Sequence, residues 1–123
     1  LFPSYLTSGL YEKYLKKEAN LTWLANNLNT NTRYLSEIIR IYRDKNFADY
    51  INGLRIDYIV NKLYNEPKYR QYKISSFAEE CGFASSRVFV NAFKKINEVP
   101  PSYFIDQLKQ DESADKRIKK AVI

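Results

Sequence analysis

The feature of this sequence that most constrains its fold is a pattern of apolar residues that occurs twice. The pattern consists of Leu21, Leu24, Ala25 and Leu28 in the first copy and of Ile74, Phe77, Ala78 and Cys81 in the second. After a polar turn, an arginine and two apolar residues follow in each copy, namely Arg33, Leu35 and Ile39 and then Arg87, Phe89 and Phe93. Spacings of three and four place such residues on one side of a helix. A short helix with a central alanine, a turn and a second helix is typical of a helix-turn-helix, so the sequence predicts two such units.

The segment between the two copies predicts one long helix. Residues 47–63, FADYINGLRIDYIVNKL, have an apolar stripe wide enough to pack on both sides, formed by Phe47, Tyr50, Ile51, Leu54, Tyr58, Ile59 and Leu63. The chain has three glycines and four prolines, and its apolar residues do not alternate with the period of two that strands need. We therefore expect an all-α fold, in which a long linker helix joins two helix-turn-helix units that are homeodomain-like three-helix subdomains.

These patterns divide the chain into four parts. We expect an N-terminal helix with the first unit in residues 1–46, the linker helix in 47–64, the second unit with a closing helix in 65–110, and a frayed tail in 111–123. The N-terminal helix is expected from Ser8 to Lys17, and residues 65–73 are expected to be a polar linker. The side chains expected in the core are Leu35, Ile38, Ile39 and Tyr42 from the helix that starts at Thr32, and Tyr103, Phe104 and Leu108 from a closing helix that runs from Pro101 to Gln110.

The residue types present exclude most kinds of enzyme. With one cysteine and no histidine, the chain cannot form an internal disulfide, the usual zinc sites or a Ser-His or Cys-His pair. The acidic pairs Glu79-Glu80 and Asp111-Glu112 are adjacent in sequence and therefore point in different directions on a helix. We expect no catalytic residue, no metal site and no cofactor. Cys81 lies among apolar helix positions and is expected to be a small buried residue.

The charge and the ends of the chain indicate its surroundings. Of the 123 residues, 20 are Lys or Arg and 14 are Asp or Glu, and the net charge of +6 favours a polyanionic partner. No apolar run approaches the roughly 20 residues of a membrane span, and the first residues lack the apolar region of a signal peptide. We expect a cytoplasmic domain that does not itself contact a membrane. Because the sequence contains no methionine, even at position 1, we expect it to be part of a longer polypeptide.

The second helix of the second unit has two different sides, which predicts DNA binding. Phe89 and Phe93 face the core, whereas Arg87, Asn91 and Lys94 face outward. Arginine can pair with guanine and asparagine with adenine, and the phosphate contacts are expected from Lys94, Lys95, Ser85 and Ser86. A linker helix of about 17 residues is roughly 25 Å long, which brings the two second helices near the roughly 34 Å between successive major-groove faces. We expect one chain to contact two adjacent grooves of double-stranded DNA.

The second helix of the first unit is a less favourable candidate. Its outward residues are Asn31, Thr32, Arg33, Ser36, Glu37 and Arg40. The carboxylate of Glu37 would repel phosphates unless it accepts from a cytosine amine, and its alternative role is an ion pair with Arg33 or Arg40. Two alternatives stay open: an ordinary amphipathic helix with a solvated polar side, and a helical protein-interaction module that keeps the fold without specific DNA recognition.

Three stretches closely resemble a known family: ANNLNTNTRYLSEII, FADYINGLRIDYIVNKL and ISSFAEECGFASSRVFVNAFKKINEVPPSYF. They are similar to the AraC/XylS-type DNA-binding domain of bacterial transcription regulators, over residues 21–108. The resemblance implies two helix-turn-helix units on a seven-helix fold, with Thr32, Arg33, Ser36, Glu37 and Arg40 in one groove and Ser86, Arg87, Val90, Asn91 and Lys94 in the next. It also implies a structural role for Arg55.

The sequence departs from the family pattern at three positions. Asp44 and Glu98 stand where the family commonly has glycine after each recognition helix, and Asn91 stands where arginine is frequent. The residues before Leu21 look like a branch in which this domain ends a longer regulator with helical repeats and a membrane-spanning segment. That resemblance implies a regulator at the inner membrane, with this end in the cytoplasm, that acts on the transcription machinery and can dimerise.

Overall fold

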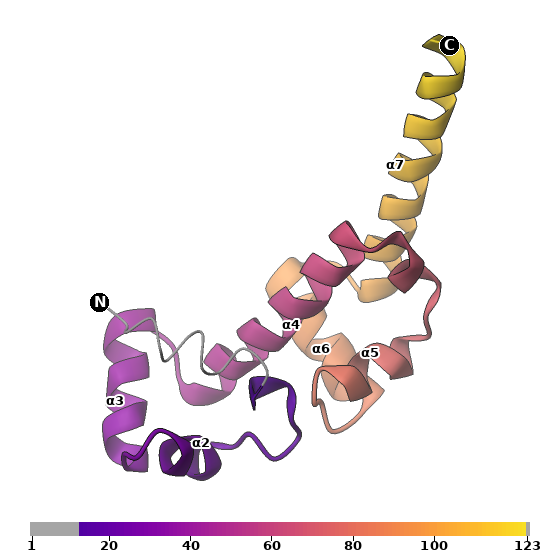
Figure 1. Cartoon of the computed structure of the whole chain (residues 1–123). Coiled ribbons are helices and arrows are strands. Elements are labelled where there is room, and N and C mark those ends of the chain that lie inside the picture. The colour runs from indigo at the N-terminus through magenta and orange to yellow at the C-terminus, as the bar shows by residue number, and fades with distance from the viewer. Residues whose placement is uncertain (1–12, 123) are drawn as a thin grey trace.

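The computed structural model describes the backbone of residues 13–122 and the side chains of residues 14–113. Within that part, six α-helices and two short 3-10 helices (η) are present, and no strand occurs. They are, in chain order, η1 (Lys13–Leu15), α2 (Leu21–Asn27), α3 (Thr32–Arg43), α4 (Phe47–Asn65), η2 (Pro67–Gln71), α5 (Ile74–Glu80), α6 (Ser86–Asn97) and α7 (Pro101–Val122). Figure 1 shows α2 and α3 at one end of α4, and α5, α6 and α7 at the other. The predicted all-α fold of two helix-turn-helix units on a linker helix is confirmed.

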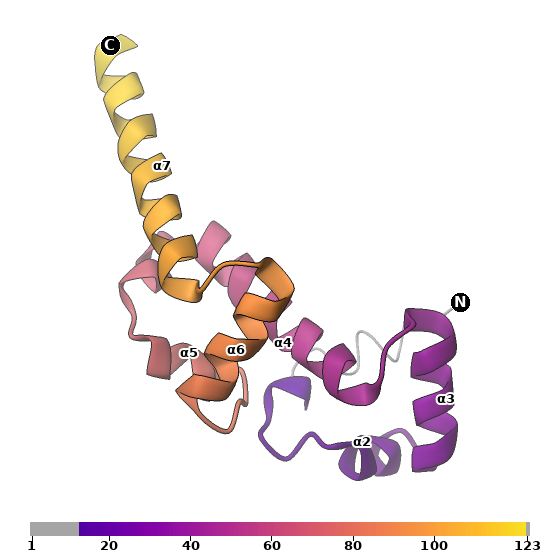
Figure 2. The ribbon, with the colours of Figure 1, turned by 180° about the vertical axis from the view of Figure 1, so that it is seen from behind.

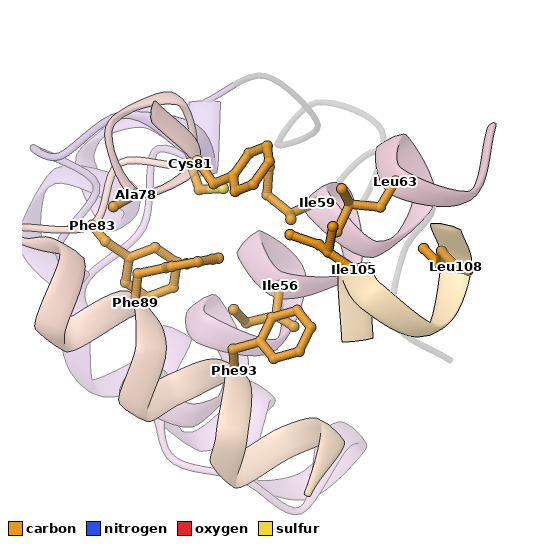
Figure 3. Packing of buried hydrophobic residues seen from close by; sticks show 11 residues of the cluster. Ile56, Ile59, Leu63, Ala78, Cys81, Phe83, Phe89, Phe93, Ile105 and Leu108 are labelled. Carbon is orange, nitrogen blue, oxygen red and sulfur yellow. The ribbon is translucent and has the colours of Figure 1, made fainter. Parts of the chain in front are cut away.

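Each unit has its own hydrophobic core. The first is made by Tyr14, Leu24, Ala25, Leu35, Ile39, Tyr50 and Ile51, and the second by Ile56, Ile59, Leu63, Phe77, Ala78, Cys81, Phe83, Phe89, Phe93, Ile105 and Leu108. Side chains of α4, α6 and α7 converge in the second core (Figure 3). Helix α4 contributes to both, with Tyr50 and Ile51 at its start and Ile56, Ile59 and Leu63 further along. At about 1.5 Å per residue its 19 residues span roughly 28 Å.

The sequence repeat is also a repeat of backbone geometry. The N–H of Thr30 donates to the Ala25 carbonyl at 2.9 Å, and the N–H of Phe83 donates to the Ala78 carbonyl at the same distance. The turns contain Asn29 at φ 53° and Gly82 at φ 83°. Both alanines are almost fully buried, at 2% and 3% exposure. The small central side chain therefore lies where the two helices of each unit cross, as the sequence predicted.

Both second helices begin on a polar cap and end on a strained residue. The side chains of Asn31 and Ser85 accept from the backbone of the first turns of α3 and α6. At the other ends, Asp44 and Glu98 adopt left-handed backbone angles, φ 53° and 66°, while their N–H groups donate to Arg40 and Lys94. Glycine adopts this conformation without a steric penalty. The helices thus end where the family pattern has glycine, but with residues that do not favour the required conformation.

Several local expectations about the first unit and the linker were wrong. Most of the expected helix Ser8 to Lys17 lies outside the described residues, and its described end is only η1 followed by a turn. Tyr42 is 48% exposed, because α3 buries a narrower side than expected. The expected linker, residues 65–73, contains η2, and its Arg70 is buried with its Nε donating to the Leu63 carbonyl at 2.9 Å. Side-chain bonds to the end of α4 therefore hold this polar segment in place.

The closing helix also differs from its expected form. Helix α7 continues to Val122 instead of ending at Gln110, because no proline or glycine interrupts it and Glu112 forms an ion pair with Arg70 at 3.0 Å. Tyr103 is 53% exposed, whereas Ile105 takes the expected place in the core at 5%. None of the helices in residues 13–122 is both long and apolar enough to cross a membrane.

We expect Glu98→Gly to raise the free energy of unfolding by about 1 kcal/mol, because a left-handed residue with a side chain costs roughly that much. Urea unfolding followed by circular dichroism measures the change. Glu98→Ala is the matched control, since it removes the same carboxylate but keeps a side-chain carbon and should give no such gain. An equal gain in both variants would show that charge, and not backbone strain, limits the end of α6.

Candidate nucleic-acid interface

Helix α6 is held by one side and leaves the other side free. Phe89 and Phe93 are completely buried and pack at ring distances of 5.5 Å against Phe83 and Phe104 respectively. Edge contacts between aromatic rings add about 0.5–1.5 kcal/mol each to the burial itself. Three of the predicted contact residues on the opposite side are exposed, namely Arg87, Asn91 and Lys94. A rigid helix with this arrangement can present arginine and asparagine to base edges.

The remaining predicted residues of α6 are in mixed surroundings. Ser85 is exposed, and its hydroxyl accepts from the Val88 N–H at 3.3 Å, so it caps the helix. Ser86 is half-buried, and Val90 is half-buried against the second core. The start of α6 therefore combines two hydroxyl groups with the positive end of the helix dipole, which suits a phosphate.

On helix α3, one of the predicted arginines already lies near a carboxylate of the same helix. Arg33, Glu37 and Arg40 are exposed, whereas Thr32 and Ser36 are half-buried. The Arg33 Nε lies 3.9 Å from the Glu37 carboxylate, and the two side chains are 91% and 52% exposed. Such an exposed pair stabilises a helix by only about 0.3–0.5 kcal/mol, so its arginine can exchange partners at little cost.

The two candidate helices have similar orientations. In Figure 2, α3 is upright and α6 is tilted, on either side of the beginning of α4, and the chain runs upward through each. Their polar N-terminal ends, at Asn31 and Ser85, are thus at the same end of the view. Two recognition helices that run in a common direction would each meet the duplex in the same way, one in each of two successive major-groove faces.

Lys95, predicted to contact phosphate, has a protein partner. Its Nζ lies 3.2 Å from a carboxylate oxygen of Asp49 at the start of α4. The pair borders a groove of about 300 Å³ between α4 and α6 that also includes Lys45 and Asp57. Burial raises the pKa of the Asp57 carboxyl, and the nearby Lys45 charge partly opposes that rise. In this structure Lys95 joins the second unit to the linker helix, a role that its sequence position did not suggest.

Two buried arginines join separate elements of the domain through hydrogen bonds. The Nε and Nη2 of Arg55 donate to the Tyr14 and Lys16 carbonyls at 2.7 and 2.8 Å. The Arg55 guanidinium also lies over the Phe83 ring, 5.5 Å from its centre. Burial lowers the pKa of Arg55 from its ordinary value. Arg70 bonds the end of α4 and the Glu112 carboxylate of α7. The family resemblance implied a structural role for Arg55. The partners of both arginines lie far away in sequence or offer only a backbone carbonyl, so no sequence pattern pointed to those partners.

No described group offers other chemistry. Cys81 is completely buried, and burial raises the pKa of its thiol far above the usual range, so it stays protonated. Among the residues described, no cluster of three or more histidine, cysteine or acidic residues could hold a metal ion.

Comparison with known proteins was made for both sequence and fold. A family model described as a helix-turn-helix domain matches residues 24–107. No curated protein matches the chain. The C-terminal domain of the two-component response regulator yesN from Fusobacterium nucleatum has a TM-score of 0.71 at 22% identity, covering 83% of this chain and 95% of its own.

Two further solved structures share the fold. The C-terminal domain of AraT, a response regulator from Geobacillus stearothermophilus, has a TM-score of 0.71 at 22% identity, with 85% of this chain and 83% of that one covered. A transcriptional regulator from Chromobacterium violaceum, described as AraC-type DNA-binding domain-containing, has a TM-score of 0.71 at 19% identity, with 87% and 91% covered. At these identities the likeness establishes the arrangement of helices and not the contacts they make.

Proposed function

The chain belongs to the AraC-type helix-turn-helix family, whose members are DNA-binding domains of transcription regulators and not enzymes, and we propose that it binds double-stranded DNA sequence-specifically with α3 and α6 in successive major grooves. The observation that carries this proposal is the repeat: two capped second helices with the same direction, each buried on one side and polar on the other, joined by one helix.

In this proposal α6 recognises bases. Arg87 pairs with a guanine and Asn91 with an adenine, while Val90 offers an apolar contact to a thymine methyl group. Lys94, Ser85 and Ser86 bind phosphates and fix the position of the helix on the duplex. Lys95 is paired with Asp49, and this ion pair must open before Lys95 reaches a phosphate.

Helix α3 contributes mainly to orientation in this proposal. Arg40, Thr32 and Ser36 contact the backbone of the neighbouring groove, and Arg33 exchanges the Glu37 carboxylate for a phosphate or a base. The long 3.9 Å separation of that pair supports such an exchange. We further propose that the domain acts in the cytoplasm. Membrane anchoring, dimerisation and contact with the transcription machinery stay predictions that rest on the family resemblance.

One observation favours a second candidate, a protein-interaction module. Tyr34 and Ile41 on α3 are 56% and 64% exposed, and at a spacing of seven residues they lie on the same side of the helix, where a protein partner could cover them. Under this alternative α3 binds a protein, and only α6, or neither helix, contacts DNA.

We expect the full chain to enrich specific sequences from a pool of random duplex DNA. Fluorescence titration of an enriched duplex should show affinity falling on the order of a thousandfold between about 50 and 200 mM salt, since six or more phosphate contacts release counterions. Failure to enrich any sequence, together with an affinity indifferent to salt, would favour the protein-interaction module.

We expect Arg87→Ala and Lys94→Ala to weaken binding in different ways. Arg87→Ala should reduce discrimination at one base pair by about 1–3 kcal/mol, because the bidentate pair with guanine is lost. Lys94→Ala should weaken every sequence alike and reduce the salt slope by about one. Titrating each variant against the enriched duplex and its single-base variants measures both effects. A uniform loss for Arg87→Ala would remove its assigned role.

We expect Asp49→Asn to strengthen binding to all duplexes about two- to fivefold, because it releases Lys95 and removes a negative charge. The double variant Asp49→Asn with Lys95→Ala is the control, and it should show no gain over Lys95→Ala. If Asp49→Asn gains as much when Lys95 is absent, the ion pair does not compete with DNA.

A further inference from the structure

The segment Tyr14–Lys16 passes between the two units and contacts both. Tyr14 is 3% exposed and belongs to the first core, whereas Leu15 is half-buried and packs against both cores. Tyr58 of α4 is the other half-buried side chain in contact with both cores. Because the two cores are otherwise built from separate residues, this segment is placed to control how the units sit on each other.

The second unit touches this segment with its backbone. A side-chain carbon at Gly82 would lie 2.2 Å from the Leu15 carbonyl oxygen and 2.9 Å from the Lys16 carbonyl carbon, which is closer than any real contact. Glycine at this position therefore allows the turn between α5 and α6 to lie directly on the segment. The positive φ of 83° requires glycine for a second reason.

Arg55 fastens the segment to the linker helix. It is 8% exposed and donates to the Tyr14 and Lys16 carbonyls, on both sides of Leu15. Hydrogen bonds from a buried charged group are stronger than neutral ones, and both carbonyls would lose a partner without it. Since the same guanidinium lies over Phe83 of the second unit, one side chain connects the segment, α4 and the α5–α6 turn.

The linker helix needs such a connection because it is weakest between the two cores. Gly53 lies between Ile51, which packs in the first core, and Ile56, which packs in the second, and an interior glycine weakens a helix. At about 100° per residue, Arg55 lies on nearly the opposite side of α4 from Gly53. The exposed Lys95–Asp49 pair spans the glycine side, and the buried Arg55 bonds span the other.

We propose that Tyr14–Lys16, Arg55 and Gly82 form a clamp that fixes the placement of α6 relative to α3. Binding across two grooves then depends on positioning residues that do not touch DNA. This inference rests on the proposed function for its consequence, but the clamp itself can be tested without DNA.

The first experiment measures the placement of the helices in the free protein. Spin labels on cysteines introduced at the exposed positions Tyr34 and Val88 report the α3–α6 distance by double electron–electron resonance, and buried Cys81 stays unlabelled. We expect one narrow distance distribution in the parent protein and a broadened one in Arg55→Met. The matched control is Arg70→Met, because Arg70 is equally buried at 8% but bonds only within the second unit and to α7.

Two further variants keep the test decisive. Arg55→Lys retains the charge and one donor and should restore part of the narrow distribution. Leu15→Ala removes packing against both cores and leaves the Arg55 hydrogen bonds to the Tyr14 and Lys16 carbonyls in place, and it should also broaden the distribution. Unchanged distributions in both Arg55→Met and Leu15→Ala, with folding verified by circular dichroism, would overturn the clamp.

The second experiment tests the consequence for binding. The probe is a duplex enriched by the parent protein, used unchanged and with two base pairs inserted between its half-sites. We expect Arg55→Met to bind the unchanged duplex about tenfold more weakly, because preorganisation of two linked contacts is lost. We also expect the insertion to reduce the affinity of Arg55→Met by a smaller factor than it reduces the affinity of the parent protein. Equal insertion penalties in both proteins would overturn the functional role. If the parent protein enriches no duplex, the proposed function fails while the distance measurement still decides the clamp.

Discussion

The structure depends on a single helix that must be apolar toward two different partners. Helix α4 supplies Tyr50 and Ile51 to one small core and Ile56, Ile59 and Leu63 to another, so neither unit is complete without it. Two cores of this size, each formed by three or four short helices, would be marginal as separate domains. Sharing the helix removes a flexible connection and keeps the two polar sides at a separation set by helix geometry, roughly 28 Å for 19 residues.

The same constraint explains why the second unit is the better candidate for base recognition. Its core contains four completely buried phenylalanines, Phe77, Phe83, Phe89 and Phe93, which form a chain of ring contacts from α5 to α6. A helix so strongly held needs nothing from its outer side for stability, so that side can carry arginine, asparagine and lysine. Helix α3 also buries two side chains, but they are the smaller Leu35 and Ile39, and it leaves Tyr34 and Ile41 exposed.

Patterns among neighbouring residues predicted the repeat. The features that they did not predict depend on contacts between residues far apart in the sequence. The apolar spacing and the central alanine of each unit depend on neighbouring residues, and these features were found where expected. Arg70 makes its bonds by folding back on Leu63 and reaching Glu112, so a polar stretch that resembles a linker is fixed. Tyr42 and Tyr103 have the periodicity of core residues but are 48% and 53% exposed. Whether the outward residues of α3 and α6 contact DNA depends on a partner that no intramolecular pattern describes.

The acidic residues near the candidate interface are part of its chemistry. A net charge of +6 favours binding to any polyanion. For a domain that has to find one DNA site among many, tight binding to non-specific sites lowers specificity. The Glu37 carboxylate lies near Arg33, and the Asp49 carboxylate lies near Lys95. A DNA phosphate that binds either cation would have to displace the carboxylate first. Under the proposed function, these exchanges would reduce the free energy gained from phosphate contacts for every sequence, whereas the exposed Arg87 and Asn91 would gain only on matching bases. Weakening the general attraction in this way increases the share of the binding free energy that depends on sequence.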